Sequence, residues 1–185
     1  PPIALAVSGL PGSFFSVEPA YGLHTLASNA NLRAEAFYPP DGTNGWRTAC
    51  AGWQGAGSVP ASGTGSVCTF TLTGPSIITW LWQEQTALTH ESSPTGALSG
   101  ITWHAAGSAA SSLEAPEHHA AGAVELTFAG WEVDGARWPA DGAPSPLQIT
   151  GLPMPAPRTA TARYLPSSRD LDGNGFPDWF EERYF

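Results

Sequence analysis

The chain contains no lysine, and its seven basic residues are arginines scattered among 185 residues. Sixteen acidic residues bring the formal net charge to −9. Without a basic stripe the sequence does not match the electrostatic pattern of a nucleic-acid-binding protein, and an anionic membrane surface would repel it. The absence of lysine also excludes Lys–Asn isopeptide crosslinks within the chain.

Long hydrophobic runs and catalytic motifs are missing as well. No apolar run approaches the roughly 20 residues of a membrane-spanning helix, so membrane insertion is not expected. The sequence has no nucleophile elbow, phosphate-binding loop or zinc-ligand spacing. We therefore expect a protein that is not an enzyme. The chain begins Pro1-Pro2, without a methionine or a signal-peptide pattern, which favours a mature or excised product.

Cysteine is scarce, and the two that occur are Cys50 and Cys68. Both lie in strand-like segments separated by a Gly/Ser/Pro-rich connector. This pattern favours a disulfide across a hairpin, with two buried free thiols as the alternative. The bridge would contribute roughly 3 kcal/mol of stability and would need an oxidising compartment, so it favours a secreted or cell-surface protein.

Turn-forming and aromatic residues dominate what is present. Twenty-one glycines and eighteen prolines indicate many turns and short elements, while eight tryptophans and eight phenylalanines provide a core. Gly/Ala/Thr/Ser-rich segments interrupted by single aromatics predict an all-β fold, either a sandwich or a barrel. Asp134-Gly135 predicts a type I′ hairpin turn. Before the C-terminal tail only residues 111–119 suggest a helical turn.

The chain also contains an internal repeat. Ala51-Gly52-Trp53 recurs as Ala129-Gly130-Trp131, and a similar strand closes each unit, around Trp82 and Tyr164. Tyr21 and Trp103 are separated by the same interval as Trp82 and Tyr164. We therefore predict a first β-repeat at 1–86, a second at 87–166, and a calcium-binding loop with a terminal helix at 167–185.

The first repeat resembles a known family through two stretches, residues 46–63 and the closing Ile78-Thr79-Trp80-Leu81-Trp82. They are similar to repeats in large secreted proteins of Verrucomicrobia and related bacteria, which resemble divergent InlB B-repeats. The second repeat matches mainly through Phe128-Ala129-Gly130-Trp131 and its closing strand. The resemblance implies two small β-rich modules, β-grasp-like or sandwich-like, that act as a surface spacer or adhesion unit without catalytic residues. Cys68 departs from the family pattern.

The strongest motif runs from Asp170 to Glu181 and matches the twelve-residue calcium-loop template at each key position. Ca²⁺ prefers six to eight oxygen ligands. Gly175 stands where the chain must turn sharply, and the alternative is an acidic tail rich in turn residues. The expected ligands of one Ca²⁺ ion are Asp170, Asp172, Asn174, the Phe176 carbonyl, Asp178 (through water) and Glu181.

The prolines around this loop indicate that it works alone. Several prolines between 153 and 166 are incompatible with an incoming helix, and Pro177 lacks the N–H that bridges paired loops. The motif resembles the half-hands of thrombospondin type 3 and dockerin repeats. Residues 178–185 predict a short exit helix, too short to be stable alone, so its aromatic side chains must dock either on the β body or on another chain.

Three functions are compatible with these features. We expect an extracellular structural or interaction module of a bacterial surface protein or fibre, whose partners are copies of itself or neighbouring modules. The stretch Ile3–Val7 offers strand addition to another copy as a route to assembly, with pairing inside its own sheet as the alternative. The other functions are a carbohydrate-binding module and an accessory fragment of a secreted hydrolase. Expected glycan or partner contacts are Trp46, Trp80, Trp82 and Trp179, with core packing as the alternative.

Overall fold

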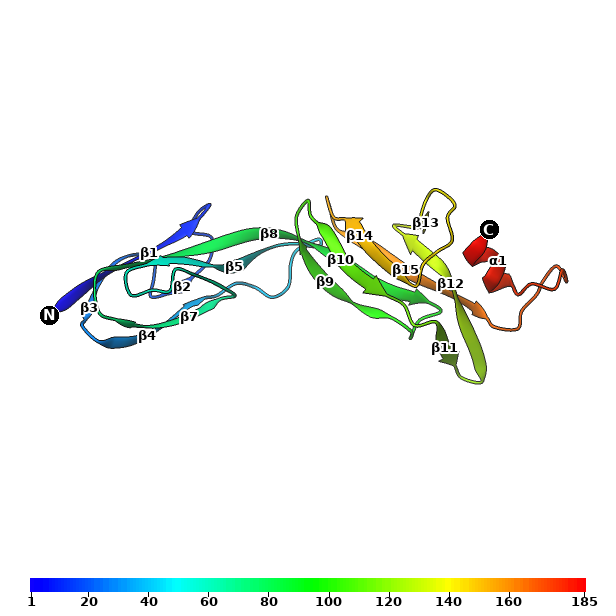
Figure 1. Cartoon of the computed structure of the whole chain (residues 1–185), viewed down its shortest axis with the longest axis horizontal. Helices are drawn as coiled ribbons and strands as arrows, with labels where there is room; N and C mark the ends of the chain where they lie inside the picture. The colour runs from blue at the N-terminus through cyan, green and yellow to red at the C-terminus, as the bar shows by residue number, and fades with distance from the viewer. The chain divides into compact units, whose positions relative to one another are not determined.

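The computed structural model describes residues 1–185, with the side chain of Ser111 left out. Strands account for 58 % of the chain and helix for 4 %, which confirms the all-β prediction (Figure 1). Contacts divide the chain into unit 1 (Pro1–Thr43 and Arg47–Gln85) and unit 2 (Asn44–Trp46 and Thr86–Phe185). The C-terminal tail, expected as a separate segment, is part of unit 2.

Unit 1 contains two sheets. The larger one follows the order β3-β1-β8-β5-β6, in which β1 and β8 are parallel. The smaller one follows the order β2-β4-β7 and is antiparallel. The strands are β1 (Pro2–Leu10), β2 (Val17–Glu18), β3 (Gly22–Ala27), β4 (Ala30–Ala36), β5 (Trp46–Ala56), β6 (Ser62–Thr64), β7 (Val67–Leu72) and the first part of β8 (Ser76–Ser93).

Unit 2 is built in a similar way from later residues. The second part of β8 pairs with β9 and, in parallel, with β15, which pairs with β12. β11 and β13 pair with β12, and β10 with β14 forms the second sheet. The strands are β9 (Ser99–Ala105), β10 (Ala109–Glu114), β11 (His118–Ala121), β12 (Val124–Val133), β13 (Ala136–Trp138), β14 (Gln148–Pro153) and β15 (Arg158–Pro166); the helix is α1 (Asp178–Tyr184).

The two units share one pairing plan. In each, the closing strand (β8 or β15) lies between a parallel opening strand (β1 or β8) and the strand that carries Ala-Gly-Trp (β5 or β12). An edge strand (β3 or β9) pairs with the opening strand in both. A duplicated module would produce this correspondence, and it follows the repeat seen in the sequence.

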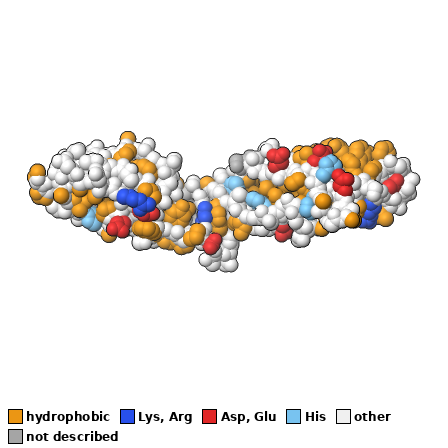
Figure 2. Space-filling model, turned by 90° about the horizontal axis from the view of Figure 1, so that it is seen from below, with side chains coloured by type: hydrophobic (Ala, Val, Ile, Leu, Met, Phe, Trp, Pro, Cys, Tyr) orange, Lys and Arg blue, Asp and Glu red, His pale blue; other side chains and the backbone are white. Residues whose placement is uncertain are grey.

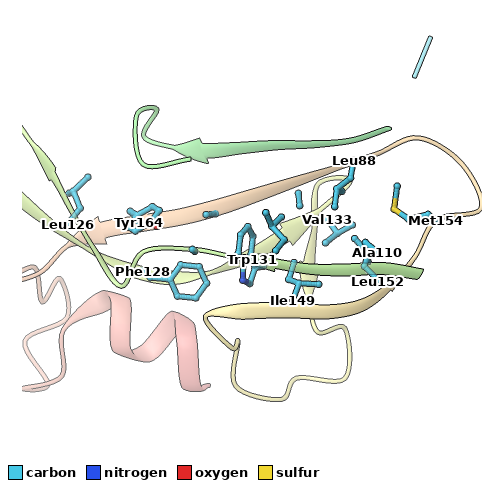
Figure 3. Packing of buried hydrophobic residues seen from close by; sticks show 14 residues of the cluster. Leu88, Ala110, Leu126, Phe128, Trp131, Val133, Ile149, Leu152, Met154 and Tyr164 are labelled. Atoms are coloured by element: carbon cyan, nitrogen blue, oxygen red, sulfur yellow. The ribbon is translucent and has the colours of Figure 1, made fainter. Parts of the chain in front are cut away.

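Each unit has its own hydrophobic core between its two sheets. Trp80 and Trp53 belong to the core of unit 1 and meet edge to face, with ring centroids 6.0 Å apart. In unit 2, Phe128 packs against both Trp131 and Tyr164 (Figure 3). Because side chains from both sheets fill each core, the units are sandwich-like and not β-grasp-like.

Local predictions succeeded where the turn or alternation signal was strong. Asp134 and Gly135 both have positive φ, 54° and 78°, as the predicted type I′ turn between β12 and β13 requires. The helical turn expected at 111–119 is wrong, because β10 pairs with β14 and β11 pairs with β12 there. Pairing of β10 with the distant strand β14, and of β11 with the adjacent strand β12 in a hairpin, overrides the local helical preference in this segment.

The repeated glycine of Ala-Gly-Trp has a different role in each unit. Gly52 has φ +147°, and a Cβ there would stand 2.1 Å from the carbonyl oxygen of Gly63. Gly130 has no such φ, and its Cβ would meet Ser145 at an ordinary 3.5 Å. The backbone of β5 therefore requires glycine at its motif position, whereas the bulged strand β12 does not.

Substituting alanine at the two motif glycines should consequently give unequal results. Gly52→Ala should lower the free energy of unfolding of unit 1 by about 1 to 3 kcal/mol, the range for a side chain forced into a glycine-only backbone conformation. Gly130→Ala is the matched control and should change stability by less than about 1 kcal/mol. Urea denaturation of both variants measures the difference, and equal losses would contradict the special role of Gly52.

Candidate functional site: the loop 170–181 and its surroundings

The predicted calcium loop lies between the last strand and the only helix of the described residues. β15 ends at Pro166, and α1 begins at Asp178 with Pro177 as its N-cap residue. This confirms both a loop without an incoming helix and a short exit helix. Gly173 and Gly175 have φ of +71° and +92°, so they supply the left-handed turns that reverse the chain.

Four of the expected ligands are gathered by hydrogen bonds within the loop. Asp170 accepts backbone N–H bonds from Gly173 (2.8 Å) and Gly175 (3.0 Å), the two neighbours of Asn174. The Asn174 side-chain amide donates to both Asp172 (3.0 Å) and Glu181 (2.7 Å). The amide NH₂ thus bridges two carboxylates, and a partially positive donor occupies the position between them.

Asp178 makes no hydrogen bond to the side chains of these four residues and has other partners. Its carboxylate pairs with Arg169 (Nε–Oδ2 2.8 Å) and accepts the N–H of Leu171 (2.8 Å). Among the described residues, no group of three or more His, Cys, Asp or Glu side chains is arranged to hold a metal. In the calcium-loop template the carboxylates of Asp172, Asp178 and Glu181 all point toward one ion. Here Asp172 and Glu181 bind the Asn174 amide instead, and Asp178 binds Arg169.

The sequence analysis did not predict that Arg169, which directly precedes the loop, contacts loop residues. Besides its ion pair, its carbonyl accepts the N–H of Asp178 at 2.7 Å. A basic residue immediately before an acidic loop was the available signal. These two bonds fasten the start of the loop to the first turn of α1.

The Phe176 position contributes through its backbone and its ring. Its N–H donates to the Asn174 side-chain oxygen at 2.8 Å. Its ring stacks on Phe180, with centroids 5.5 Å apart and planes 14° apart. The loop and the helix are therefore joined by aromatic packing as well as by polar contacts.

The helix docks on the β body, the first of the two expected alternatives. α1 packs against β12 and β15. Trp179 donates its indole N–H to the carbonyl of Ser167 (3.2 Å), and Arg183 places its guanidinium 5.6 Å from the Phe128 ring centre. The Ser145 N–H donates to the Arg183 carbonyl at 3.0 Å. These contacts supply the stability that the short helix lacks by itself.

The predicted disulfide between Cys50 and Cys68 is not formed; both residues are buried free thiols. The expected hairpin does not exist, because Cys50 lies in β5, whereas Cys68 lies in β7 and pairs with Ala34 of β4. The two cysteines come from different sheets and share the core of unit 1. Burial raises the pKa of both thiols, which keeps them protonated and unreactive.

Reducing agent should therefore leave the stability unchanged. We expect the same Tm with and without dithiothreitol, and thiol titration should find two reactive groups only after denaturation. Thermal melts and a colorimetric thiol assay measure both. A clear drop in Tm on reduction would indicate a bridge and contradict the buried-thiol arrangement.

The tryptophans proposed as glycan contacts do not form a surface platform. Trp80 and Trp82 are 0 % and 6 % exposed and belong to the core of unit 1. They project from the same face of β8, as their alternation predicts, but that face points inward. Trp46 is 37 % exposed, and Trp179 is half-buried against Ser167. Core packing, and not a sugar-stacking row, explains the Trp80/Trp82 pair.

The N-terminal strand is paired along both of its edges. Ile3 to Val7 of β1 pair with Leu26 to Gly22 of β3 on one side, and Leu5 to Leu10 pair with Ser76 to Leu81 of β8 on the other. From Leu5 onward both edges of β1 are therefore occupied, whereas Ile3 and Ala4 pair only with β3. Pairing inside its own sheet, the alternative stated for Ile3–Val7, is thus what the structure shows, and it gives strand addition to another copy no support.

Charge is distributed without a dominant patch on the face seen in Figure 2. Acidic and arginine side chains are scattered there among hydrophobic ones. No helix among the described residues has both the length and the apolarity that crossing a membrane would require. The electrostatics thus agree with the absence of a basic stripe in the sequence.

Sequence comparison finds no relatives, since no protein-family model and no curated protein matches the chain. One solved structure, "Streptococcal High Identity Repeats in Tandem (SHIRT) domains 3-4 from cell surface protein", aligns over 89 % of this chain and 99 % of its own. The identity is 12 % and the TM-score is 0.28. A TM-score this low does not indicate a shared fold, so the alignment carries no functional conclusion for this chain.

Proposed function

We propose that this chain is a non-catalytic, extracellular structural and interaction module of a bacterial surface protein or fibre, stabilised by one calcium ion in the loop 170–181. The observation that carries the proposal is the gathering of Asp170, Asp172, Asn174 and Glu181 in one hydrogen-bonded loop. Two sandwich units in tandem suit a spacer that separates or displays neighbouring modules of a larger surface protein. The partners implied are neighbouring modules or other copies of the chain.

The composition of the loop fits a hard divalent cation. Asp172 and Glu181 bring two carboxylates to the Asn174 amide, and Asp170 is bonded to the glycines on either side of it. Carboxylates gathered in this way repel one another. Turning the Asn174 amide over would replace its NH₂ with its oxygen, and the Phe176 N–H would give up its present bond to that oxygen. A cation in the same place would then bind oxygens only, which is the ligand set that Ca²⁺ prefers.

Calcium in this position would act on the docking of the helix. Glu181 belongs to α1, whereas Asp170 and Asp172 precede it, so an ion shared by them ties the helix to the chain leaving β15. A seven-residue helix is not stable alone. By fixing the position of the helix, the ion would maintain its contacts with Ser167, Arg163 and Ser145.

Limited proteolysis with trypsin tests this role directly, because the chain has only seven trypsin sites. Cleavage after Arg169, next to the loop, should be at least several-fold slower in millimolar Ca²⁺ than in EDTA. Cleavage after Arg137, an exposed residue in the β12–β13 hairpin, is the internal control and should not change relative to the protease's own calcium response. Equal Ca²⁺ dependence at both sites would argue against a calcium-held tail.

A further inference from the structure

Two histidines on consecutive strands meet at one hydroxyl group in unit 2. His90 lies in β8, and His104 lies in β9, the strand that pairs with it. The Nε2 atom of each ring is 2.9 Å from the Thr102 hydroxyl. Each looks isolated in the sequence, but the pairing of β8 with β9 directs both imidazoles to the same point.

The alternation of side chains along β9 explains why there is space beside the Thr102 hydroxyl. Gly100, Thr102 and His104 are spaced by two and therefore share one face of the strand. A Cβ at Gly100 would lie 3.8 Å from His90 Nδ1, so the absence of a side chain leaves room beside that ring. The neighbouring Glu91 faces the other way and accepts a hydrogen bond from Thr161 (3.0 Å). Among the described residues, the two imidazoles share the Thr102 hydroxyl and form no ion pair with a carboxylate.

Both rings are kept in the form that binds metals. Burial lowers the pKa of His104, and burial together with the proximity of His104 lowers the pKa of His90. Neutral imidazole is the ligand form of histidine, and imidazole nitrogen suits Cu²⁺ and Zn²⁺, whereas Ca²⁺ prefers oxygen. The chemistry of this pair is therefore distinct from that of the acidic loop.

We propose that His90 and His104 form a binding site for a transition-metal ion, with Cu²⁺ bound more tightly than Zn²⁺ and with water completing the shell. The ion takes the place of the Thr102 hydroxyl between the two Nε2 atoms. Metal–nitrogen bonds are about 2.0–2.1 Å long, shorter than the 2.9 Å from each Nε2 atom to the Thr102 hydroxyl. Both rings therefore turn toward the ion, and so toward each other, on binding. This site cross-links β8 to the edge strand β9 and does not depend on the calcium proposal.

Calorimetric titration of the whole chain with Zn²⁺, and separately with Cu²⁺, in millimolar Ca²⁺ tests the site. We expect about one equivalent to bind, with the lower Kd for Cu²⁺. His90→Asn and His104→Asn should each raise the Kd at least about tenfold, because even loss of a supporting group around a metal costs 10- to 100-fold. His118→Asn is the matched control, since His118 is another histidine of unit 2 and lies 3.8 Å from Glu125, outside the His90/His104 pair.

Nuclear magnetic resonance of the unmodified chain gives a second readout that does not depend on how the variants fold. Zn²⁺ should shift the imidazole resonances of His90 and His104 and leave those of His24 and His118 in place. Three results would overturn the proposal: no binding of either ion, unchanged affinity in the His90→Asn/His104→Asn double variant, or loss of binding in His118→Asn. Binding that disappears with Asp170→Ala would assign the metal to the acidic loop and also reject it.

Discussion

Replacing Trp80 with alanine should lower the free energy of unfolding of unit 1 by about 3 to 5 kcal/mol, the range for deleting a large buried aromatic side chain. Trp80 is 0 % exposed and packs edge to face on Trp53. Its removal leaves a cavity between the two sheets that the surrounding strands cannot fill. Amide hydrogen exchange in β1 and β8 measures the effect within unit 1.

Two control variants separate packing from other effects at this position. The indole N–H of Trp80 is buried without a hydrogen-bond partner, so Trp80→Phe removes an unsatisfied donor while keeping an aromatic ring, and it should cost clearly less than alanine. Leu23→Ala on the edge strand β3, where Leu23 is 75 % exposed, should change stability by no more than about 0.5 kcal/mol. Equal losses in all three variants would contradict a core centred on Trp80.

Saturating calcium should stabilise unit 2 by about 3 kcal/mol when its concentration is about 100 times the Kd. For a chain of this size that corresponds to a rise in Tm of about 5 to 10 °C over the EDTA-treated protein. The gain arises because the ion binds the folded loop and has no comparable site in the unfolded chain. Thermal melts in Ca²⁺ and in EDTA measure it.

Variants of acidic residues show whether the gain comes from the loop. In Asp170→Ala the calcium-dependent rise in Tm should disappear, because the residue that anchors the first turn is lost. Asp41→Ala removes an exposed carboxylate in unit 1 and should keep the full rise. A rise that persists in Asp170→Ala would place the responsible ion elsewhere.

Strands were predicted well from the sequence where a residue pattern reflects local geometry. The sequence predicts strands at Val67–Leu72 and Val124–Val133, and these are the bounds of β7 and β12, since apolar alternation and flanking turns delimit both strands. The short strands β2 and β6, the strands β10 and β11, and the second part of β8 were not predicted. β10 is held by β14 and the second part of β8 by β15, both distant in sequence, and local composition carries little information about such partners. β11 instead forms a hairpin with the adjacent strand β12.

The errors around the cysteines and tryptophans have the same origin. A Gly/Ser/Pro-rich connector suggested a hairpin between Cys50 and Cys68, but β6 pairs with β5 and β4 pairs with β7. For Trp80 and Trp82, alternation correctly placed both rings on one face. Whether that face meets solvent or a second sheet depends on β2, β4 and β7, whose position is a tertiary property.

The loop 170–181 was the most predictable part of the site, because its turns and its acidic spacing are local. Its two positive-φ glycines and its exit helix follow directly from the residue pattern. The pairing of Asp178 with Arg169 did not, since a single basic neighbour has many competing partners. The meeting of His90 with His104 required knowledge of which strands pair.

Calorimetric titration of Ca²⁺ into the EDTA-treated chain tests the calcium-stabilised loop most directly. We expect one saturable site with a stoichiometry near one, and strongly weakened binding in Glu181→Gln, which keeps the size of the side chain but removes its charge. Absence of saturable binding at millimolar Ca²⁺, or unchanged binding in Glu181→Gln, would contradict a calcium site at 170–181.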